Sequence, residues 1–208
     1  MDQQTRIARI RSVVDSVPWK KFPDPLGAAV DLSEPLLRIA LDRRLPQEER
    51  YYCSGLVNHI CLQGTMSELT LPTVRTVNRL LAMDLAVKPD LLYELLEVLT
   101  SSRTELEMTD PETGERVTMW QAVFRELYEH KDLYLRDLQQ TTPLASPALL
   151  DLLWFLAPKY PDIIDQSTAR AGALDGAERK ALEAKIEAMR EAVDEDQTDH
   201  DSRYDLEP

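Results

Sequence analysis

Leucine residues recur along this chain at the spacing of one face of an α-helix, and this pattern constrains the fold more than any other feature. The spacing appears in two segments, Leu91, Leu92, Leu95, Leu96 and Leu99, and Leu149, Leu150, Leu152, Leu153 and Leu156. No glycine-rich phosphate loop or nucleophile motif stands between these segments. The chain has only six Gly, too few for a turn-rich β architecture, and most of its thirteen Pro fall between periodic segments. We therefore expect an all-α protein built from stacked helices.

Capping residues and prolines divide the chain into expected helices. These cover about 3–16, 33–43, 48–64, a segment from Thr70, 88–102, 118–138, a segment from Ser146 to Pro158 or Pro161, and a last helix from Asp175. Thr118 and Gln121 have the spacing of a capping box. A Pro-rich linker, residues 17–31, separates the first two helices, and we expect Trp19 and Phe22 to hold it against the domain.

The periodicity is interrupted at residues 103–117. A turn-forming cluster at 110–114 separates two weakly alternating arms, so this insertion is either a short hairpin or a polar loop. The resulting organisation is a helical repeat domain over 1–170 and a C-terminal helix over 171–194. After Arg190 acidic residues dominate and apolar residues are scarce, so we expect 195–208 to be a disordered acidic tail.

The charge balance restricts the partners. Asp and Glu total 37 against 24 Lys and Arg, which gives a net charge of −13 and argues against nucleic acid or an anionic membrane as a partner. The chain shows no signal peptide and no apolar run long enough to span a bilayer. Cys53 and Cys61 are eight residues apart in one expected helix, about 12 Å along its axis, too far for a disulfide. Reduced cysteines are typical of a cytoplasmic protein.

Residues that could carry catalysis or bind metal are sparse. His59 lies between Cys53 and Cys61, but on a helix these three side chains point in different directions, so we expect no metal site. A Ser or Cys nucleophile would need an oriented His and an oxyanion-binding segment, and no such arrangement is visible. We therefore expect no catalytic residues and no cofactor.

The middle of the chain carries a more specific pattern. A helix ending in the turn Gln63-Gly64-Thr65 is followed by a Pro-led helical segment, Leu71-Pro72-Thr73-Val74, and then by the leucines of 91–96. From about residue 33 to residue 165 the chain resembles the bacterial HEAT-like repeat proteins common in actinomycetes. It departs from them at Leu62, where members often carry His. The resemblance implies an α-solenoid of stacked antiparallel helix pairs that serves as a scaffold for protein contacts.

The same comparison suggests a partner-binding surface. In stacked helix pairs the second helices line the concave face, and Arg75 and Arg79 are four residues apart on the polar side of such a helix. Arg and Tyr are favoured interface anchors, so the candidate site comprises Tyr51, Gln63, Glu68, Arg75 and Arg79. The alternative interpretation is structural: Gln63 caps the helix end, Gly64 supplies a positive φ and the two Arg form ordinary salt bridges.

The expected function is non-catalytic protein recognition in the bacterial cytoplasm. An immunity or adaptor role is its most concrete form, because some HEAT-like proteins look like immunity proteins. Two other classes stay open. A HEAT-like enzyme that excises damaged DNA bases would need a cationic concave face, whereas Trp120 and Trp154 lie on apolar stripes. A self-associating structural protein would reveal itself through a mass that depends on concentration.

Overall fold

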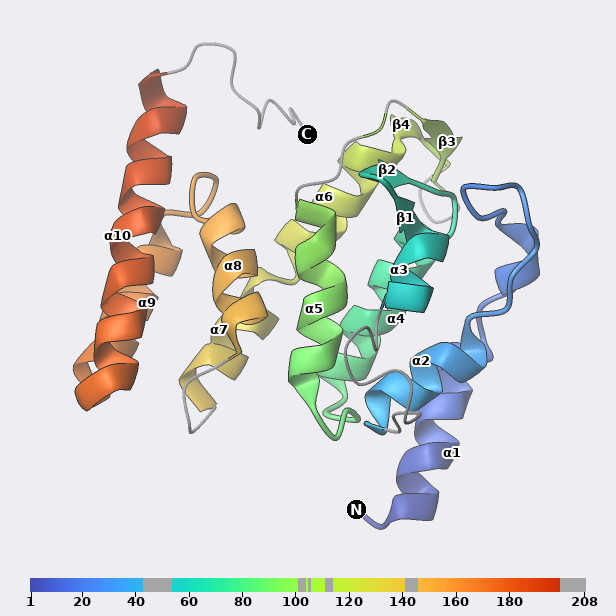
Figure 1. Cartoon of the computed structure of the whole chain (residues 1–208), viewed down its shortest axis with the longest axis horizontal. Helices are drawn as coiled ribbons and strands as arrows, with labels where there is room; N and C mark the ends of the chain where they lie inside the picture. The colour runs from blue at the N-terminus through green and yellow to red at the C-terminus, as the bar shows by residue number, and fades with distance from the viewer. Residues whose placement is uncertain (43–53, 101–103, 105, 111–113, 141–145, 199–208) are drawn as a thin grey trace. The chain divides into compact units, whose positions relative to one another are not determined.

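The computed structural model describes residues 1–42, 54–100, 104, 106–110, 114–140 and 146–198 (Figure 1). The chain divides into two compact units, Met1–Leu127 and Tyr128–Pro208. Regular structure in the described residues is mostly helical, which confirms the all-α expectation. The division differs from the expected domain boundary near residue 170, which falls inside the helix Asp162–Gly172.

Unit 1 contains most of the expected elements. They are α1 (Gln3–Val14), the 3₁₀ turn η1 (Trp19–Lys21), α2 (Ser33–Ala40), α3 (Ser54–Ile60), β1 (Cys61–Leu62), β2 (Thr65–Met66), α4 (Thr70–Ala82), α5 (Pro89–Thr100), β3 (Glu107–Thr109), β4 (Arg116–Thr118) and α6 (Met119–Glu129). Helix α6 begins in unit 1 and crosses the boundary. Helix α1 packs against α2 and α4, and α5 packs against the same two helices.

The insertion after α5 is a hairpin, one of the two forms expected from the sequence. Strands β3 and β4 pair antiparallel, with Met108 opposite Val117. The capping box that follows is confirmed: the Gln121 backbone N–H donates to Thr118 Oγ1, and Gln121 Oε1 accepts from the Thr118 backbone N–H.

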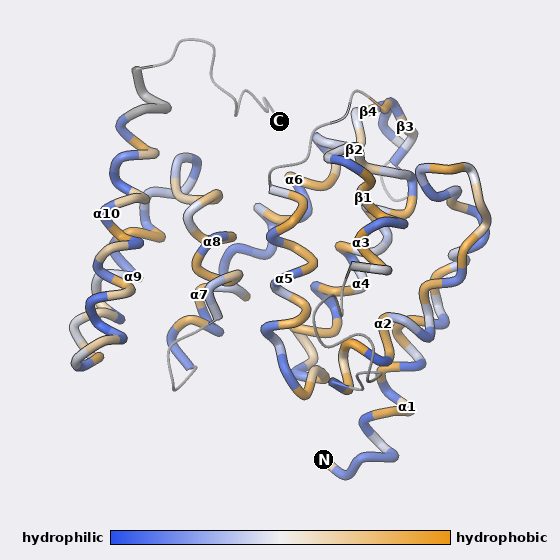
Figure 2. Tube along the Cα trace, viewed as in Figure 1, coloured by the Kyte–Doolittle hydropathy of each residue, from blue (hydrophilic) through white to orange (hydrophobic). Residues whose placement is uncertain are grey.

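Helix α4 is the most deeply buried helix of unit 1. Leu71, Val74 and Leu80 of this helix have no exposed surface, and Figure 2 shows orange apolar segments recurring along α4 and α5. Buried threonines also line this helix. The Thr73 and Thr76 hydroxyls donate to carbonyls one turn earlier, as Thr73 does to Leu69 at 2.7 Å, and the Thr70 hydroxyl donates to the Ile60 carbonyl. These polar groups are therefore buried without losing a hydrogen bond.

The helix expected over 48–64 ends earlier than the sequence suggested. In the described residues α3 stops at Ile60, and the chain then forms the β1–β2 hairpin. The cause lies at the start of α4. There the Ser67 hydroxyl donates to the His59 carbonyl, and the Thr70 hydroxyl donates to the Ile60 carbonyl. These bonds satisfy the last carbonyls of α3 and turn the chain back.

Unit 2 consists of α7 (Lys131–Gln140), α8 (Pro147–Leu156), α9 (Asp162–Gly172) and α10 (Gly176–Thr198). The expected helix over 118–138 is divided at His130 into α6 and α7. Helix α9 was not expected from the sequence. Helix α10 continues through Thr198 and so includes the first four residues of the expected acidic tail, whereas residues 199–208 lie outside the described part.

Unit 2 packs as two pairs of helices. Helix α7 contacts α8 and α9, and α10 contacts the same two helices. Helix α10 buries Leu182, Ile186 and Met189 on one face. At the start of α7, the Lys131 Nζ donates to Asp162 at 2.9 Å, and this bond raises the pKa of Lys131.

Candidate interaction surface

Arg75, one of the expected site residues, belongs to a buried ionic cluster. Its Nη2 lies 3.2 and 3.1 Å from the two carboxylate oxygens of Asp110, and its Nε lies 3.2 Å from Glu126 Oε2. The Arg75 side chain is only 15% exposed and that of Asp110 only 3%. The cluster joins α4, the end of β3 and α6. The contacts of Arg75 therefore lie within the fold.

The other expected site residues are divided between two ends of α4. Gln63 is exposed and Glu68 is half-buried just before α4 begins, whereas Arg79 is exposed near its end. Nine residues separate Thr70 from Arg79, which corresponds to about 14 Å along the helix axis. Tyr51 lies outside the described residues. The structure thus places Gln63 and Glu68 ahead of α4 and Arg79 near the other end of that helix.

Gln63 occupies an unusual backbone conformation. It and Gly64 form the two-residue turn between β1 and β2, with φ of 52° and 80°, the pattern of a type I′ hairpin turn. Such a turn favours Asn or Gly at its first position, because a residue with a longer side chain is strained at positive φ. Strain of this kind is concentrated at functional sites. Gln63 is therefore retained as a candidate contact residue.

Replacing Gln63 with Asn is expected to stabilise unit 1, because Asn tolerates positive φ better than Gln. The expected gain in free energy of unfolding is about 0.5–1 kcal/mol. Urea denaturation followed by circular dichroism would measure it. Gln63→Val is the matched control and should be destabilising, since a β-branched residue fits this conformation worst.

A second turn, absent from the expected site, lies between η1 and α2. Pro23 and Ala29 form an antiparallel bridge, the Asp24 N–H donates to the Ala28 carbonyl, and the Gly27 N–H donates to the Asp24 carbonyl. Asp24-Pro25-Leu26-Gly27 has the composition of a type I turn, with Asp first, Pro second and Gly fourth. The tip of this turn is Leu26, whose exposed fraction is 81%. The turn signal was present in the sequence, but the exposure of Leu26 was not predictable from it.

The Asp24 carboxylate holds this turn and links it to α3. Its Oδ1 accepts from the backbone N–H groups of Leu26 at 2.9 Å and Ala28 at 2.8 Å. Its Oδ2 lies 3.0 Å from His59 Nδ1. The Asp24 side chain is 4% exposed and the His59 side chain 41%. Two segments 35 residues apart are thereby fixed to each other.

These bonds hold the pKa of Asp24 below its ordinary value of about 3.8. The largest cause is the hydrogen bond from the Ala28 N–H, and His59 and the Leu26 N–H contribute as well. A carboxylate with a lowered pKa in the folded state stabilises the fold above the pKa of the unfolded chain. That contribution is lost as the pH falls through the folded-state value.

Stability is therefore expected to decrease below about pH 4 in a way that depends on Asp24. The difference in free energy of unfolding between wild type and Asp24→Asn should be constant from pH 7 to pH 5 and should shrink between pH 4 and pH 2. Urea titrations at each pH would measure it. A difference that stays constant down to pH 2 would contradict the assignment.

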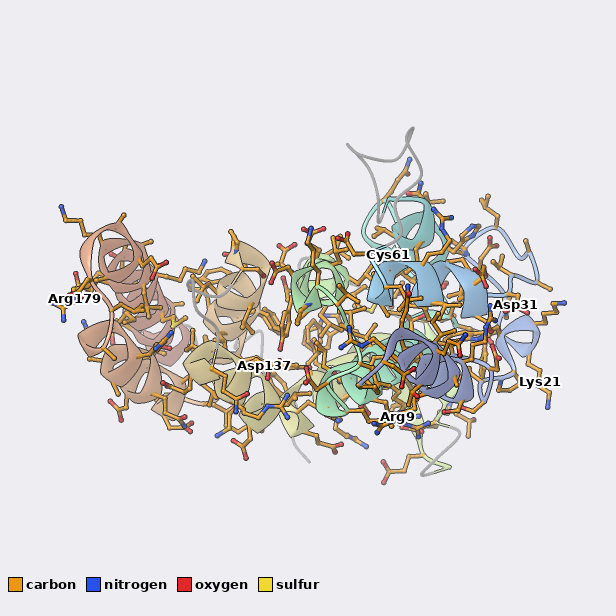
Figure 3. The ribbon with its side chains drawn as sticks, turned by 90° about the horizontal axis from the view of Figure 1, so that it is seen from below. Arg9, Lys21, Asp31, Cys61, Asp137 and Arg179 are labelled. Carbon is orange, nitrogen blue, oxygen red and sulfur yellow. The ribbon has the colours of Figure 1, made fainter. Side chains whose placement is uncertain are left out.

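The two turns lie in segments that are nearly free of charge. Charged residues make up 29% of the chain, yet residues 22–30 and 54–67 contain only one, the buried Asp24. Figure 3 shows Lys21 and Asp31, which flank the first segment, at the same end of unit 1, and labels Cys61 on the strand before the second turn. Interface cores are depleted of charge in the same way. We give the name Leu26 patch to five of the exposed or half-exposed residues of these two segments, namely Leu26, Ala28, Ala29, His59 and Gln63.

The Leu26 patch presents an apolar tip, an imidazole and a side-chain amide on two turns. Across the described residues, no three His, Cys, Asp or Glu side chains are grouped so as to hold a metal ion. Within the same ranges, no helix is both long and apolar enough to cross a bilayer. Comparisons with protein-family models, curated proteins and solved structures give no match.

Proposed function

We propose that this chain is a non-catalytic protein-recognition scaffold and that the Leu26 patch contacts its partner. The observation that carries the proposal is Leu26 itself, an apolar side chain held 81% exposed on a turn whose backbone is fixed by a buried carboxylate. A group that is already ordered before binding loses little entropy on association. Loops on a rigid scaffold are the usual carriers of recognition.

We also propose that the scaffold is a HEAT-like solenoid. In support, α1 pairs with α2 and α4 with α5, while the first helices of the two pairs contact each other and so do the second helices. Unit 2 repeats this scheme with α7, α8, α9 and α10. Stacked pairs of this kind bury their apolar faces against their neighbours. An adaptor or immunity role in the bacterial cytoplasm is the form of the proposal that the resemblance favours.

The test is affinity capture from the native host with the intact chain as bait. Three baits are compared: wild type, Leu26→Asp and Val87→Asp. Val87 is the matched control, because it is an exposed apolar residue of unit 1 outside the Leu26 patch, at 47% exposure. We expect one stoichiometric protein with wild type and Val87→Asp, and its loss with Leu26→Asp. Equal capture by all three baits, capture by none, or recovery of duplex DNA would overturn the proposal.

A further inference from the structure

We infer that His59 is a positioning residue: through Asp24 it holds the Leu26 turn in the conformation that a partner meets. The inference rests on the proposed function of the Leu26 patch and adds how that surface is kept ready for binding. His59 belongs to α3, whereas the turn lies between η1 and α2. Asp24 and His59 are 35 residues apart in the chain, so a side-chain bond between them fixes tertiary structure.

The turn needs such a tether because its apolar tip is mostly exposed to solvent. Leu26 is 81% exposed, and Gly27, Ala28 and Ala29 are exposed as well. Side-chain burial therefore cannot hold this segment in place. The Asp24 carboxylate supplies the order instead, because it accepts two backbone N–H groups of the turn. A carboxylate that is 4% exposed must itself be held by a partner, and His59 Nδ1 at 3.0 Å provides one.

The chemistry of the pair places a proton on Nδ1 of the imidazole. An ionised carboxylate only accepts hydrogen bonds, so His59 Nδ1 is the donor to Asp24 Oδ2. The His59 side chain is 41% exposed and belongs to the Leu26 patch. A partner that covers the Leu26 patch is consequently expected to place an apolar pocket over Leu26 and a polar group opposite Nε2 of His59.

The test follows the backbone N–H groups of Leu26 and Ala28 by amide hydrogen exchange in NMR on the full-length protein. Variants are His59→Ala, His59→Gln and His59→Asn. Asn is the conservative variant, because its side-chain nitrogen is attached to Cγ as Nδ1 is in His, whereas the Gln nitrogen lies one bond further out. The N–H of Thr73, which donates to Leu69 within the core, reports on the fold as a whole.

Protection of the Leu26 and Ala28 amides is expected to fall about tenfold in His59→Ala and His59→Gln and to persist in His59→Asn, with Thr73 unchanged in all three. Unchanged protection of Leu26 and Ala28 in His59→Ala would overturn the inference. So would an equal loss at Thr73, because that would indicate general destabilisation. The exchange experiment needs no partner, so failure of this inference is distinguishable from failure of affinity capture.

Discussion

Replacing Arg75 with Met is expected to lower the free energy of unfolding of this protein by about 3–5 kcal/mol. Arg75 is the cation shared by Asp110 and Glu126, and the side chains of all three are largely buried. Removing it leaves two carboxylates close together and shielded from water, where neither has its charge balanced by Arg75. This destabilisation is larger than the net stabilisation that the ion pairs provide, because most of it comes from leaving two carboxylates buried without Arg75. Urea denaturation would measure it.

Arg79 provides the matched control for this prediction. It lies one helical turn further along α4 but is exposed, so its polar contacts are screened by solvent and Arg79→Met should change the free energy of unfolding by no more than about 1 kcal/mol. Arg75→Glu should be worse than Arg75→Met, since it adds a third carboxylate to the cluster. Equal effects of the Arg75→Met and Arg79→Met variants would contradict the cluster as described.

Replacing Trp19 with Ala is expected to cost a similar amount, about 3–5 kcal/mol, because a large buried aromatic side chain is removed. Trp19 is almost fully buried, and its Nε1 donates to the Val14 carbonyl at 2.8 Å. It holds the base of the segment that carries Leu26 against the end of α1. The variant should therefore also weaken protection of the Leu26 and Ala28 amides.

Trp19→Phe separates packing from hydrogen bonding. Phe retains most of the buried ring but loses the Nε1 donor, and the Val14 carbonyl still accepts from the Ser33 hydroxyl at 3.4 Å. The expected cost is about 1 kcal/mol. If Trp19→Phe were as destabilising as Trp19→Ala, the hydrogen bond and not the packing would hold this segment.

Elements governed by local signals could be predicted from the sequence. The capping box at Thr118 and Gln121 marks the start of α6, and Ser146 caps α8 by accepting from the Leu149 N–H. The turn cluster at 110–114 allowed a hairpin or a polar loop, and the structure has the hairpin of β3 and β4. Trp19 holds the linker as expected. In each case the interacting residues are close in sequence, so the turn and capping propensities of the residues and their spacing indicate where the element lies.

Features that depend on distant residues were missed. The sequence around Arg75 suggests an exposed polar face, but Asp110 and Glu126 lie 35 and 51 residues away and convert that face into a buried contact. The helix leading to Gly64 was extended too far, because the hydroxyls that end α3 come from the start of the next helix. The bond between Asp24 and His59 is equally long-range, so the sequence could not assemble the Leu26 patch.

The measurement that tests the central claim most directly is a calorimetric titration of the purified captured partner with wild type, Leu26→Asp and Val87→Asp. If Leu26 is the anchor of the interface, Leu26→Asp should weaken binding by at least about thirtyfold, the loss typical of a hot-spot residue. Val87→Asp should bind like wild type, and both variants should unfold at the same urea concentration as wild type. Affinities within about twofold for all three proteins would show that the partner binds elsewhere and would contradict the account.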